Sequence, residues 1–310
     1  MNNKVVVFGG SGFLGSHVAD VLSEEGFEVV IYDLDDSKYL RPDQKMVKGS
    51  ILDRDKVRSV VEGAKYVYHF AAIADIKEAQ ENPVEAVEVN ILSTTYILDA
   101  CREYTVDKFI YGSTIYVYSD HGSFYWSTKQ ASELIIENYH KIYDLEYTIL
   151  RYGSLYGPRA NAFNSINRYI IQALTDQTIL REGNGEELRE YIYILDAARA
   201  SVEILSDDYS NSSIMITGSK SMRIKDLLAM IKEILNDSIE ISYTSDVLEE
   251  HYNITPYAFK PKVAKKYQLN YYHDLGQGVL EQIYSNYEKL LKDGILVEDN
   301  PFTKSDARSK

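Results

Sequence analysis

The chain begins with short apolar runs that alternate with stretches of helically spaced apolar residues. Residues 4–8 (KVVVF) form a continuous β-branched run, which is typical of a buried strand. Apolar residues then recur at helical spacing, at Leu14, Val18, Val21 and Leu22. Gly26 stands where that helix would end, and FEVVIYDL (27–34) reads as a second strand. Strand, helix and strand in this order predict a parallel α/β sheet.

The same alternation continues to the end of the chain. Further strands are expected at 109–111, 147–150, 214–218 and 239–243, and further helices at 87–101, 125–143, 164–174 and 223–236. The strand at 214–218 is expected to be the last of the main sheet. Asp196 is expected to cap a helix over 197–205. The polar residues 298–310 are expected to be a disordered tail.

A glycine pattern follows the first strand and carries the first chemical signal. The segment GGSGFLG places Gly9, Gly12 and Gly15 at three-residue intervals before the helix. Such glycines let the backbone approach a pyrophosphate, and the helix N-terminus offers it N–H groups. Asp33 ends the second strand, where a carboxylate accepts hydrogen bonds from ribose hydroxyls. This order predicts a dinucleotide site; a glycine turn in a non-binding α/β protein is the alternative.

The surroundings of Asp33 favour NAD over NADP. Asp35 and Asp36 lie close by and would repel the extra phosphate of NADP, and no arginine stands next to Asp33. A Walker-type phosphate loop is excluded, because no Gly-Lys-Ser/Thr follows the glycines.

The composition of the chain indicates a globular protein and excludes several kinds of partner and site. The 310 residues are 45% hydrophobic and can bury a sizeable core. The formal net charge of −14 argues against nucleic acid and anionic membranes as partners. No apolar run is long enough to span a membrane, and a strand near Val5 leaves no room for a signal peptide. The single cysteine, Cys101, excludes an internal disulfide and a cysteine-based zinc site, and fits a cytoplasmic protein.

The segment 108–129 carries a candidate catalytic group. Tyr125 and Lys129 are four apart, so a helix places them on one face. A phenol normally ionises near pH 10, and a nearby ammonium lowers that pKa. Thr114 could hold a substrate oxygen against the same phenol while a proton leaves it. The alternative is a surface helix with an aromatic–cation contact, since the chain has 27 tyrosines.

Together these motifs resemble the extended short-chain dehydrogenase/reductase family, and within it the NAD-dependent nucleotide-sugar epimerases and dehydratases, such as UDP-glucose 4-epimerase. The likeness covers about residues 4–290. Further matching segments are GSILD (49–53), YHFAAIA (68–74), VEVNILSTTYILDAC (87–101), RYGSLYGPR (151–159) and REGNGEELREYIYILDAARA (181–200). The resemblance implies a Rossmann-type doubly wound parallel sheet over 1–155, to which 186–218 return, and a smaller interleaved α/β substrate domain from 156–185 and 219–297.

The resemblance also implies site residues. Thr114, Tyr125 and Lys129 would be catalytic. Cofactor contacts are implied for Gly9, Gly12, Phe13, Leu14, Gly15, Asp33, Ile51, Leu52, Asp53, Phe70, Ala71, Ala72, Asn90, Tyr125, Lys129 and Tyr152. Substrate contacts are implied for Thr114, Ser154, Arg159 and Arg189, with Arg189 pairing with the diphosphate; a surface arginine is the alternative there. Lys262 and Lys265 would lie near the nucleotide end. No metal is implied, and His69 is expected to pack rather than to react.

Three departures from the family pattern bear on the substrate. Only ten residues separate Thr114 from Tyr125, about half the family's usual number, and His121 lies in this shortened loop. Ile115 and Tyr116 replace the Asp-Glu pair of sugar 4,6-dehydratases, so the acid and base for dehydration are missing. Ser154 stands where the family has a substrate-contacting asparagine, and Gly153 precedes it.

The predicted function is an NAD-dependent epimerase of a nucleotide-diphosphate sugar, acting at C4 through a transient 4-keto intermediate. The alternatives are a decarboxylase, dehydratase or net oxidoreductase of the same fold, and a non-catalytic dinucleotide-binding protein. The resemblance also implies a homodimer. Its helices 84–103 and 125–143 would meet their symmetry mates and present Leu98, Leu134 and Ile135.

Overall fold

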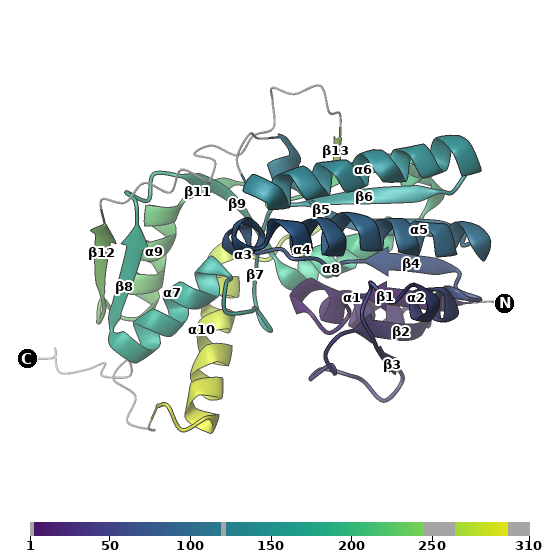
Figure 1. The fold of residues 1–310 in the computed structure, drawn as a ribbon. Helices are drawn as coiled ribbons and strands as arrows, with labels where there is room; N and C mark the ends of the chain where they lie inside the picture. The colour runs from purple at the N-terminus through teal and green to yellow at the C-terminus, as the bar shows by residue number, and fades with distance from the viewer. Residues whose placement is uncertain (1–2, 119–121, 245–263, 297–310) are drawn as a thin grey trace, which may run out of the picture.

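The computed structural model describes residues 3–118, 122–244 and 264–296 (Figure 1). Its main element is an eight-stranded sheet in the order β13-β10-β6-β5-β4-β1-β2-β3, in which all neighbouring strands pair in parallel. The strands are β1 (Lys4–Phe8), β2 (Glu28–Asp33), β3 (Lys45–Lys48), β4 (Tyr66–His69), β5 (Lys108–Thr114), β6 (Tyr147–Tyr152), β10 (Ser212–Ile216) and β13 (Lys265–Lys266). The predicted parallel sheet is therefore confirmed.

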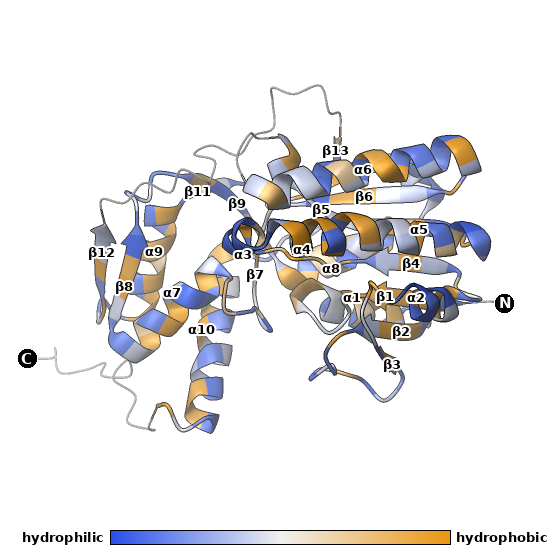
Figure 2. Cartoon of the chain, in the orientation of Figure 1, coloured by the Kyte–Doolittle hydropathy of each residue, from blue (hydrophilic) through white to orange (hydrophobic). Residues whose placement is uncertain are grey.

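Helices cover both faces of this sheet. On one face lie α1 (Phe13–Glu24) and α8 (Ile194–Glu203); on the other lie α2 (Arg54–Val61), α5 (Ser93–Glu103) and α6 (Ser123–Tyr143). Alternate strand residues point to opposite faces, so Val5 and Val7 pack toward α1 while Val6 and Phe8 pack toward α5. Two-sided burial explains the apolar runs of β1 and β2, whose ribbons carry orange segments in Figure 2. The predicted doubly wound fold is confirmed.

The strand order sets the place where a ligand would bind. From one edge the order runs β3-β2-β1-β4-β5-β6, so the chain reverses direction across the sheet between β1 and β4. In open α/β sheets, ligands bind at the carboxyl ends of the strands, at this switch point. Gly9 follows β1, Phe70 follows β4 and Thr114 ends β5. The sheet therefore brings three of the predicted site segments to one edge.

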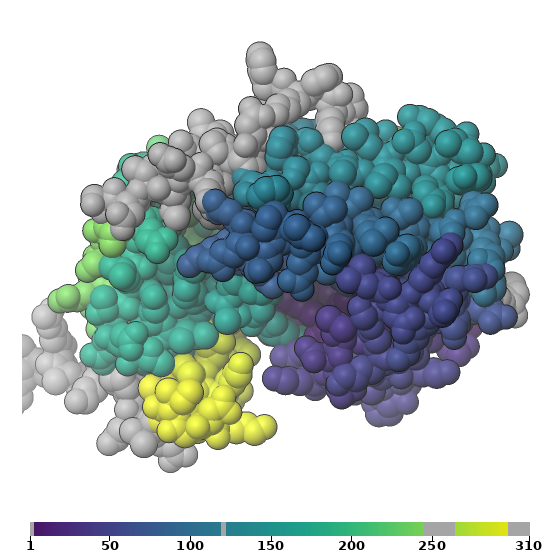
Figure 3. Space-filling model, in the orientation of Figure 1, coloured from purple at the N-terminus to yellow at the C-terminus, as the bar shows by residue number. Residues whose placement is uncertain are grey.

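A smaller part packs beside this edge. It contains α7 (Ser165–Asp176), α9 (Ile224–Ile234) and α10 (Leu275–Lys292) around a third core. Two small sheets complete it: β12 (Glu240–Thr244) with β8 (Thr178–Glu182), and β11 (Ser221–Arg223) with β9 (Leu188–Tyr193) and β7 (Ser154–Tyr156). In the space-filling view the surface is hollowed between α10, in yellow, and the N-terminal part, in purple (Figure 3).

The helical region before β5 differs from the single helix expected. It consists of α3 (Ile76–Glu81), α4 (Pro83–Val87), a π-helical turn η1 (Glu88–Leu92) and α5. A π-helical turn changes the rotational phase of the residues that follow it. Leu98 consequently faces the core and is fully buried, so its predicted exposure at a dimer surface is wrong. Leu134 on α6 is 55% exposed, as expected, and Ile135 is partly buried against the core.

Two further expectations are corrected at the other end of the sheet. The segment at 214–218 is not the last strand, because β13 pairs with the outer edge of β10. Asp196 does not cap a helix: α8 begins at Ile194, and the Asp196 carboxylate instead accepts hydrogen bonds from the backbone N–H of His273, at 2.8 Å, and from its Nδ1, at 3.0 Å. Of the segment expected to return to the main sheet, α8 and β10 do so, whereas β9 lies in the small sheet.

Within the described ranges, no helix is both long and apolar enough to cross a membrane. The predictions for His121, Lys262 and residues 298–310 fall outside those ranges. Two 3₁₀ turns, η2 (Ile115–Tyr118) and η3 (Asp207–Tyr209), complete the elements.

Candidate active site

The glycine turn after β1, residues 9–15, leaves its backbone uncovered by side chains at the glycines, and it is called the glycine cradle. Gly9 has φ +79°, and a Cβ added to it would lie 2.5 Å from the backbone nitrogen of Ala71. A Cβ on Gly15 would lie 2.1 Å from the carbonyl oxygen of Gly9. Gly12 is the N-cap of α1 and offers no side chain to the first-turn N–H groups. These groups are therefore placed to donate to the phosphates of a dinucleotide, and the turn fits NAD.

Asp33 lies at the carboxyl end of β2, directly beside this turn. Its Oδ2 accepts a hydrogen bond from the backbone N–H of Ser11 at 2.9 Å. This contact holds the carboxylate at the edge of the cradle. A carboxylate at this position fits the hydrogen bonds that the hydroxyls of an adenosine ribose would donate, and this contact of Asp33 stays a prediction.

The other residues predicted to contact adenine make contacts within the protein. Asp53 caps α2, and its Oδ1 accepts the N–H of Lys56 at 3.1 Å. Ile51 packs in the core, and the N–H of Leu52 donates to Ser50 Oγ at 3.2 Å. Their predicted contacts with adenine stay predictions.

The segment after β4 lies against the cradle and is fixed by Asn90. The N–H of Ala71 donates to the carbonyl of Phe8, which brings Phe70, Ala71 and Ala72 alongside the glycine turn. Asn90 Oδ1 accepts the N–H of Ile73 at 2.8 Å, and its Nδ2 donates to Ile73 O and to Thr128 Oγ1, both at 3.0 Å. One bond of the Asn90 Nδ2 group thus holds Ile73 and the other reaches α6, so Asn90 positions this segment against α6.

Thr114 and Tyr125 meet at the carboxyl end of β5. Thr114 Oγ1 accepts the N–H of Tyr116 at 3.2 Å. Burial raises the pKa of Tyr125 to about 12, and the neighbouring Thr114 hydroxyl partly opposes this rise. Without a nearby cation Tyr125 is therefore a neutral phenol near pH 7. The structure brings together the predicted pair.

Lys129 lies one helical turn beyond Tyr125 and is buried. Its Nζ donates to the carbonyl of Gly112 at 2.8 Å and lies 5.9 Å from the centre of the Tyr125 ring and 4.6 Å from that of Tyr111. Burial lowers the pKa of Lys129 to about 7, while the Glu133 carboxylate raises it. Its cationic state near neutral pH therefore depends on its neighbours.

A buried polar network that the sequence analysis missed lies behind Lys129. Glu133 forms a two-pronged ion pair with Arg151 of β6: Oε1 accepts Nε at 3.0 Å and Oε2 accepts Nη2 at 2.8 Å. Ser113 Oγ donates to Glu133 Oε1 at 2.6 Å, and Arg151 Nη1 donates to Tyr118 Oη at 2.6 Å. Two signals in the sequence pointed to it: Glu133 continues the Tyr125–Lys129 spacing, and Arg151 interrupts an apolar strand.

The residues expected on the substrate side lie on separate elements. Ser154 begins β7 and pairs with Tyr191 of β9. Arg189 lies in β9 and is 7% exposed, so the alternative of a surface arginine is wrong. Arg159 has φ +65°, pairs with Asp20 of α1 at 2.8 Å and stacks on the ring of Tyr39. Arg159 is thus engaged by the N-terminal part, and its predicted contact with substrate stays a prediction.

The family of the chain follows from its sequence. A model of the NAD dependent epimerase/dehydratase family matches residues 5–216, which is more than half of the chain. The chain belongs to this family. This confirms the resemblance seen in the motifs and agrees with the prediction of NAD as the cofactor.

Individual relatives differ in the reactions that their names state. A putative UDP-glucose 4-epimerase of Methanocaldococcus jannaschii is 29% identical over 271 residues, 81% of this chain and 88% of that protein. A UDP-N-acetyl-alpha-D-glucosaminuronate decarboxylase of Bacillus cytotoxicus is 29% identical over 308 residues, 88% of this chain and 93% of that protein. The chain is therefore a member of a family of NAD-dependent nucleotide-sugar epimerases, dehydratases and decarboxylases.

A solved structure shows the same fold. The UDP-glucuronic acid 4-epimerase of Bacillus cereus, in complex with UDP-glucuronic acid and NAD, superimposes with a TM-score of 0.80 at 25% identity. The match covers 92% of this chain and 99% of that chain.

Tyr152 and His69 are buried in the structure. The hydroxyl of Tyr152 is hydrogen-bonded to Ser201 of α8 at 2.6 Å, and the predicted contact of Tyr152 with the cofactor stays a prediction. His69 is buried among aromatic rings, and its Nε2 is hydrogen-bonded to Thr94 Oγ1 at 3.1 Å. The expectation that His69 packs is confirmed. In the described ranges, no group of His, Cys, Asp and Glu is arranged to hold a metal ion.

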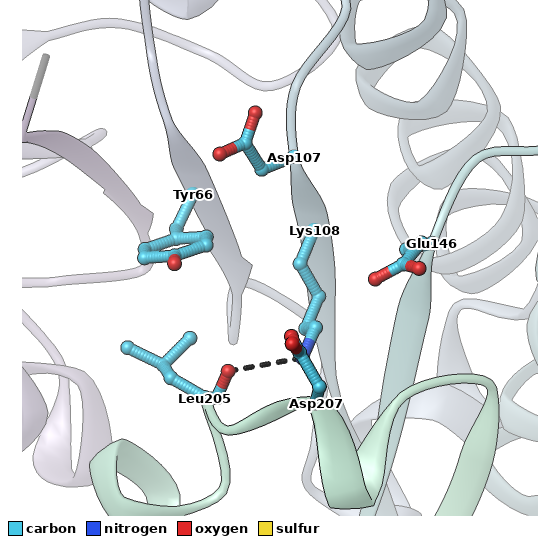
Figure 4. Close-up of a pocket in the computed structure, with 6 residues that line it drawn as sticks. All are labelled: Tyr66, Asp107, Lys108, Glu146, Leu205 and Asp207. Carbon is cyan, nitrogen blue, oxygen red and sulfur yellow. Dashed lines mark hydrogen bonds between the residues drawn. The ribbon is translucent and has the colours of Figure 1, made fainter.

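A pocket at the opposite edge of the sheet does not belong to this site. It is lined by Tyr66, Asp107, Lys108, Glu146, Leu205 and Asp207 (Figure 4). Tyr66 and Lys108 begin β4 and β5, so the pocket lies at the amino ends of the strands whose carboxyl ends carry the candidate active site. Lys108 Nζ donates there to the carbonyls of Leu205, at 3.0 Å, and Ser206, at 3.1 Å.

Proposed function

We propose that this protein is an NAD-dependent epimerase that inverts C4 of a nucleotide-diphosphate sugar through a transient 4-keto sugar. The observation that carries the proposal is the placement of Thr114 at the carboxyl end of β5 beside Tyr125, with Lys129 one helical turn behind the phenol. The glycine cradle and Asp33 lie at the same edge of the sheet. The names of the Methanocaldococcus jannaschii relative and the Bacillus cereus structure support the choice of epimerisation.

The chemistry assigns a separate task to each residue. When bound, NAD supplies a hydride acceptor that returns the hydride to the sugar carbon later in the cycle. Tyr125, as phenolate, takes the proton from the C4 hydroxyl and returns it after the keto sugar has presented its other face. Thr114 hydrogen-bonds the same oxygen and fixes its distance from the phenol. Lys129, as a cation, stabilises the phenolate against the effect of burial.

The substrate side must bind the diphosphate firmly and leave the sugar free to turn. Arg189 is buried in the central strand of the small sheet, so its backbone is held rigidly. A guanidinium fixed in this way binds a diphosphate with two parallel hydrogen bonds. Arg159 would join it only after its ion pair with Asp20 opens.

Decarboxylation of a sugar uronic acid is the second candidate. It uses the same oxidation at C4 and then loses carbon dioxide from the 4-keto acid. The specific observation in its favour is the similarity to the Bacillus cytotoxicus decarboxylase over 88% of this chain. Dehydration is disfavoured, because Ile115 and Tyr116 follow Thr114 and Ile115 is buried.

The proposal includes a homodimer formed through α4, α5 and α6. Exposed apolar side chains occur along these helices and the π-helical turn, at Val84, Val87, Leu92, Leu134 and Ile142. A second copy of the chain would cover them in a helical bundle.

The first test separates the two reactions. The purified protein is incubated with NAD and, in turn, UDP-glucose, UDP-N-acetylglucosamine and UDP-glucuronic acid, and products are read by proton NMR. The proposal expects the C4 epimer of one of these sugars without net NADH or carbon dioxide. Release of carbon dioxide from UDP-glucuronic acid would favour the decarboxylase.

Tyr125→Phe provides the control for the assigned chemistry. It should lower turnover by at least about a thousandfold, because the proton acceptor is lost, while NAD binding is retained. Full activity in Tyr125→Phe would refute the role of this residue.

A further inference from the structure

The interior of α6 carries a stripe of three polar residues rather than two. Tyr125, Lys129 and Glu133 are spaced by four, so they lie one above another on the buried face of the helix. Glu133 is 1% exposed and Lys129 is 3% exposed. A carboxylate and an ammonium are thus buried one helical turn apart directly behind the candidate catalytic phenol.

Glu133 is held by groups from two strands. Ser113 of β5 and Arg151 of β6 are register partners in the sheet, and both donate to the Glu133 carboxylate. Ser113 immediately precedes Thr114, and Arg151 immediately precedes Tyr152. The carboxylate therefore fixes α6 against the strand end that carries Thr114.

A buried ion pair of this kind contributes little net stability. The free energy needed to remove two charges from water is about as large as the free energy gained from their attraction. Well-packed apolar residues in the same place often give the folded protein equal stability. The chain has a second buried pair for comparison, Arg181 with Glu187 at 2.7 Å in the small domain. There, Arg181 Nε and Glu187 Oε2 have no hydrogen-bond partner among the described residues, whereas both oxygens of Glu133 are engaged.

From these contacts we infer that Glu133 is a positioning residue, which acts through Lys129 to keep the ammonium charged and aligned beneath Tyr125, and that Arg151 orients the Glu133 carboxylate. This role rests on the proposed function where it concerns turnover. The charge of Lys129 itself does not depend on that function.

The groups that face Lys129 support this inference from each element. Burial and the Glu133 carboxylate act on its pKa in opposite directions, and burial is the larger effect. Its titratable or charged neighbours are Tyr125 and Glu133 on α6, Tyr111 on β5 and His69 on β4. Arg151 on β6 is bonded to Glu133, and Tyr118 on η2 is bonded to Arg151. His69 and Tyr111 are neutral near pH 7, because burial lowers the pKa of His69 to about 3 and raises that of Tyr111.

The α3, α4 and π-helical elements packed on this part of α6 add no buried charge. The charged side chains of α3, α4 and the π-helical turn are exposed to solvent, at Lys77, Glu78, Glu81, Glu85 and Glu88. Solvent screens such charges strongly. Glu133 is consequently the buried anion that supports the Lys129 cation.

The test uses two variants, one for each residue of the ion pair, that should shift the titration midpoint of Lys129 in opposite directions. Glu133→Gln keeps the shape and removes the negative charge; Arg151→Met removes the positive charge and leaves the carboxylate. Lysine labelled with ¹³C at Cε reports the titration of Lys129 by NMR, assigned with Lys129→Met. We expect the midpoint to fall by about one pH unit in Glu133→Gln and to rise in Arg151→Met. Glu187→Gln breaks the other buried pair and should lower Tm without moving the midpoint.

Activity gives the second readout. In Glu133→Gln, the pH at which turnover reaches half its maximum should fall with the Lys129 midpoint by about one unit, and kcat at pH 7 should fall by up to about tenfold with KM nearly unchanged. A Lys129 midpoint that moves as expected in an enzyme that epimerises none of the sugars would overturn the proposed function and keep the positioning role.

The inference is overturned if Glu133→Gln and Arg151→Met move the Lys129 midpoint in the same direction, or if neither moves it more than Glu187→Gln does. Should Glu133→Gln fail to fold, Arg151→Met decides alone: a rise of the midpoint supports the inference, and an unchanged or lower midpoint overturns it.

Discussion

Replacing Lys129 by methionine should make the protein more stable while abolishing turnover. Methionine has a similar length and no charge, so it fills the same buried volume among Tyr111, Tyr125 and the β5 backbone. The wild-type lysine, by contrast, is a buried amine whose charged form is penalised. Burial lowers its pKa from the ordinary 10.5 to about 7.

The size of the effect follows from this pKa difference. Each pKa unit corresponds to about 1.4 kcal/mol, so burying the ammonium costs about 5 kcal/mol as an upper bound. The variant also loses the hydrogen bond from Lys129 Nζ to Gly112 O, which lowers this gain in stability by about 1–2 kcal/mol. The net gain at pH 6.5 should be about 3 kcal/mol, which raises Tm by about 5 °C in a chain of this size.

The gain should depend on pH in one direction. Below about pH 7, folded and unfolded chains both hold the Lys129 proton, so the wild type carries the whole penalty. Between about pH 7 and 10.5 the unfolded chain holds more of this proton, so wild-type stability rises with pH relative to the variant. The difference should vanish at about pH 9.5, and by about pH 10.5 the wild type should be the more stable protein, because only the loss of the hydrogen bond to Gly112 then remains.

The assay is differential scanning calorimetry of both proteins after removal of bound nucleotide, at pH 6.5, 8 and 9.5. Lys108→Met is the matched control: this lysine begins the same strand and donates to the carbonyls of Leu205 and Ser206. It should lower Tm and leave turnover intact. A Lys129→Met protein that melts at or below the wild-type temperature at pH 6.5, or a gain that does not shrink toward pH 9.5, would refute the reasoning.

Three further predictions concern other parts of the chain. Asp33→Ala should weaken NAD binding at least about tenfold by titration calorimetry, because the carboxylate at the cradle is lost; equal affinity would contradict its role. Asn90→Ala leaves the N–H and carbonyl of Ile73 without their partner and should cost about 2–4 kcal/mol in urea unfolding; a loss under about 0.5 kcal/mol would contradict this. Leu134→Glu should convert the dimer to a monomer in light scattering with little change in Tm; a wild-type monomer would exclude the proposed dimer.

Local patterns predicted the first two strands and the glycine turn between them well. The glycine turn, the apolar strands and Asp33 follow each other within about thirty residues, and each constrains the backbone on its own. Tyr125 and Lys129 could be paired for the same reason, since four-residue spacing on a helix fixes a common face.

Features that depend on distant segments were harder to predict. The π-helical turn at Glu88–Leu92 shifts the helical phase, and Leu98, which the family resemblance placed at a dimer surface, is buried. Arg159 was predicted to contact the substrate, but it forms an ion pair with Asp20. The two residues lie 139 positions apart in the sequence, so no local pattern indicates this pair. Asp196 was expected to cap a helix because the helix start was set three residues late.

The buried polar network connects the stability and the chemistry of this site. Lys129 lies where burial opposes its charge, and the proposed reaction needs that charge beneath Tyr125. A carboxylate placed one turn away offsets part of this cost, but an unpaired carboxylate would itself be costly to bury. Arg151 and Ser113 satisfy it from the two strands that end at the site. Each buried charge thus offsets part of the desolvation cost of its neighbour. This explains why a charged residue, Arg151, interrupts an otherwise apolar strand.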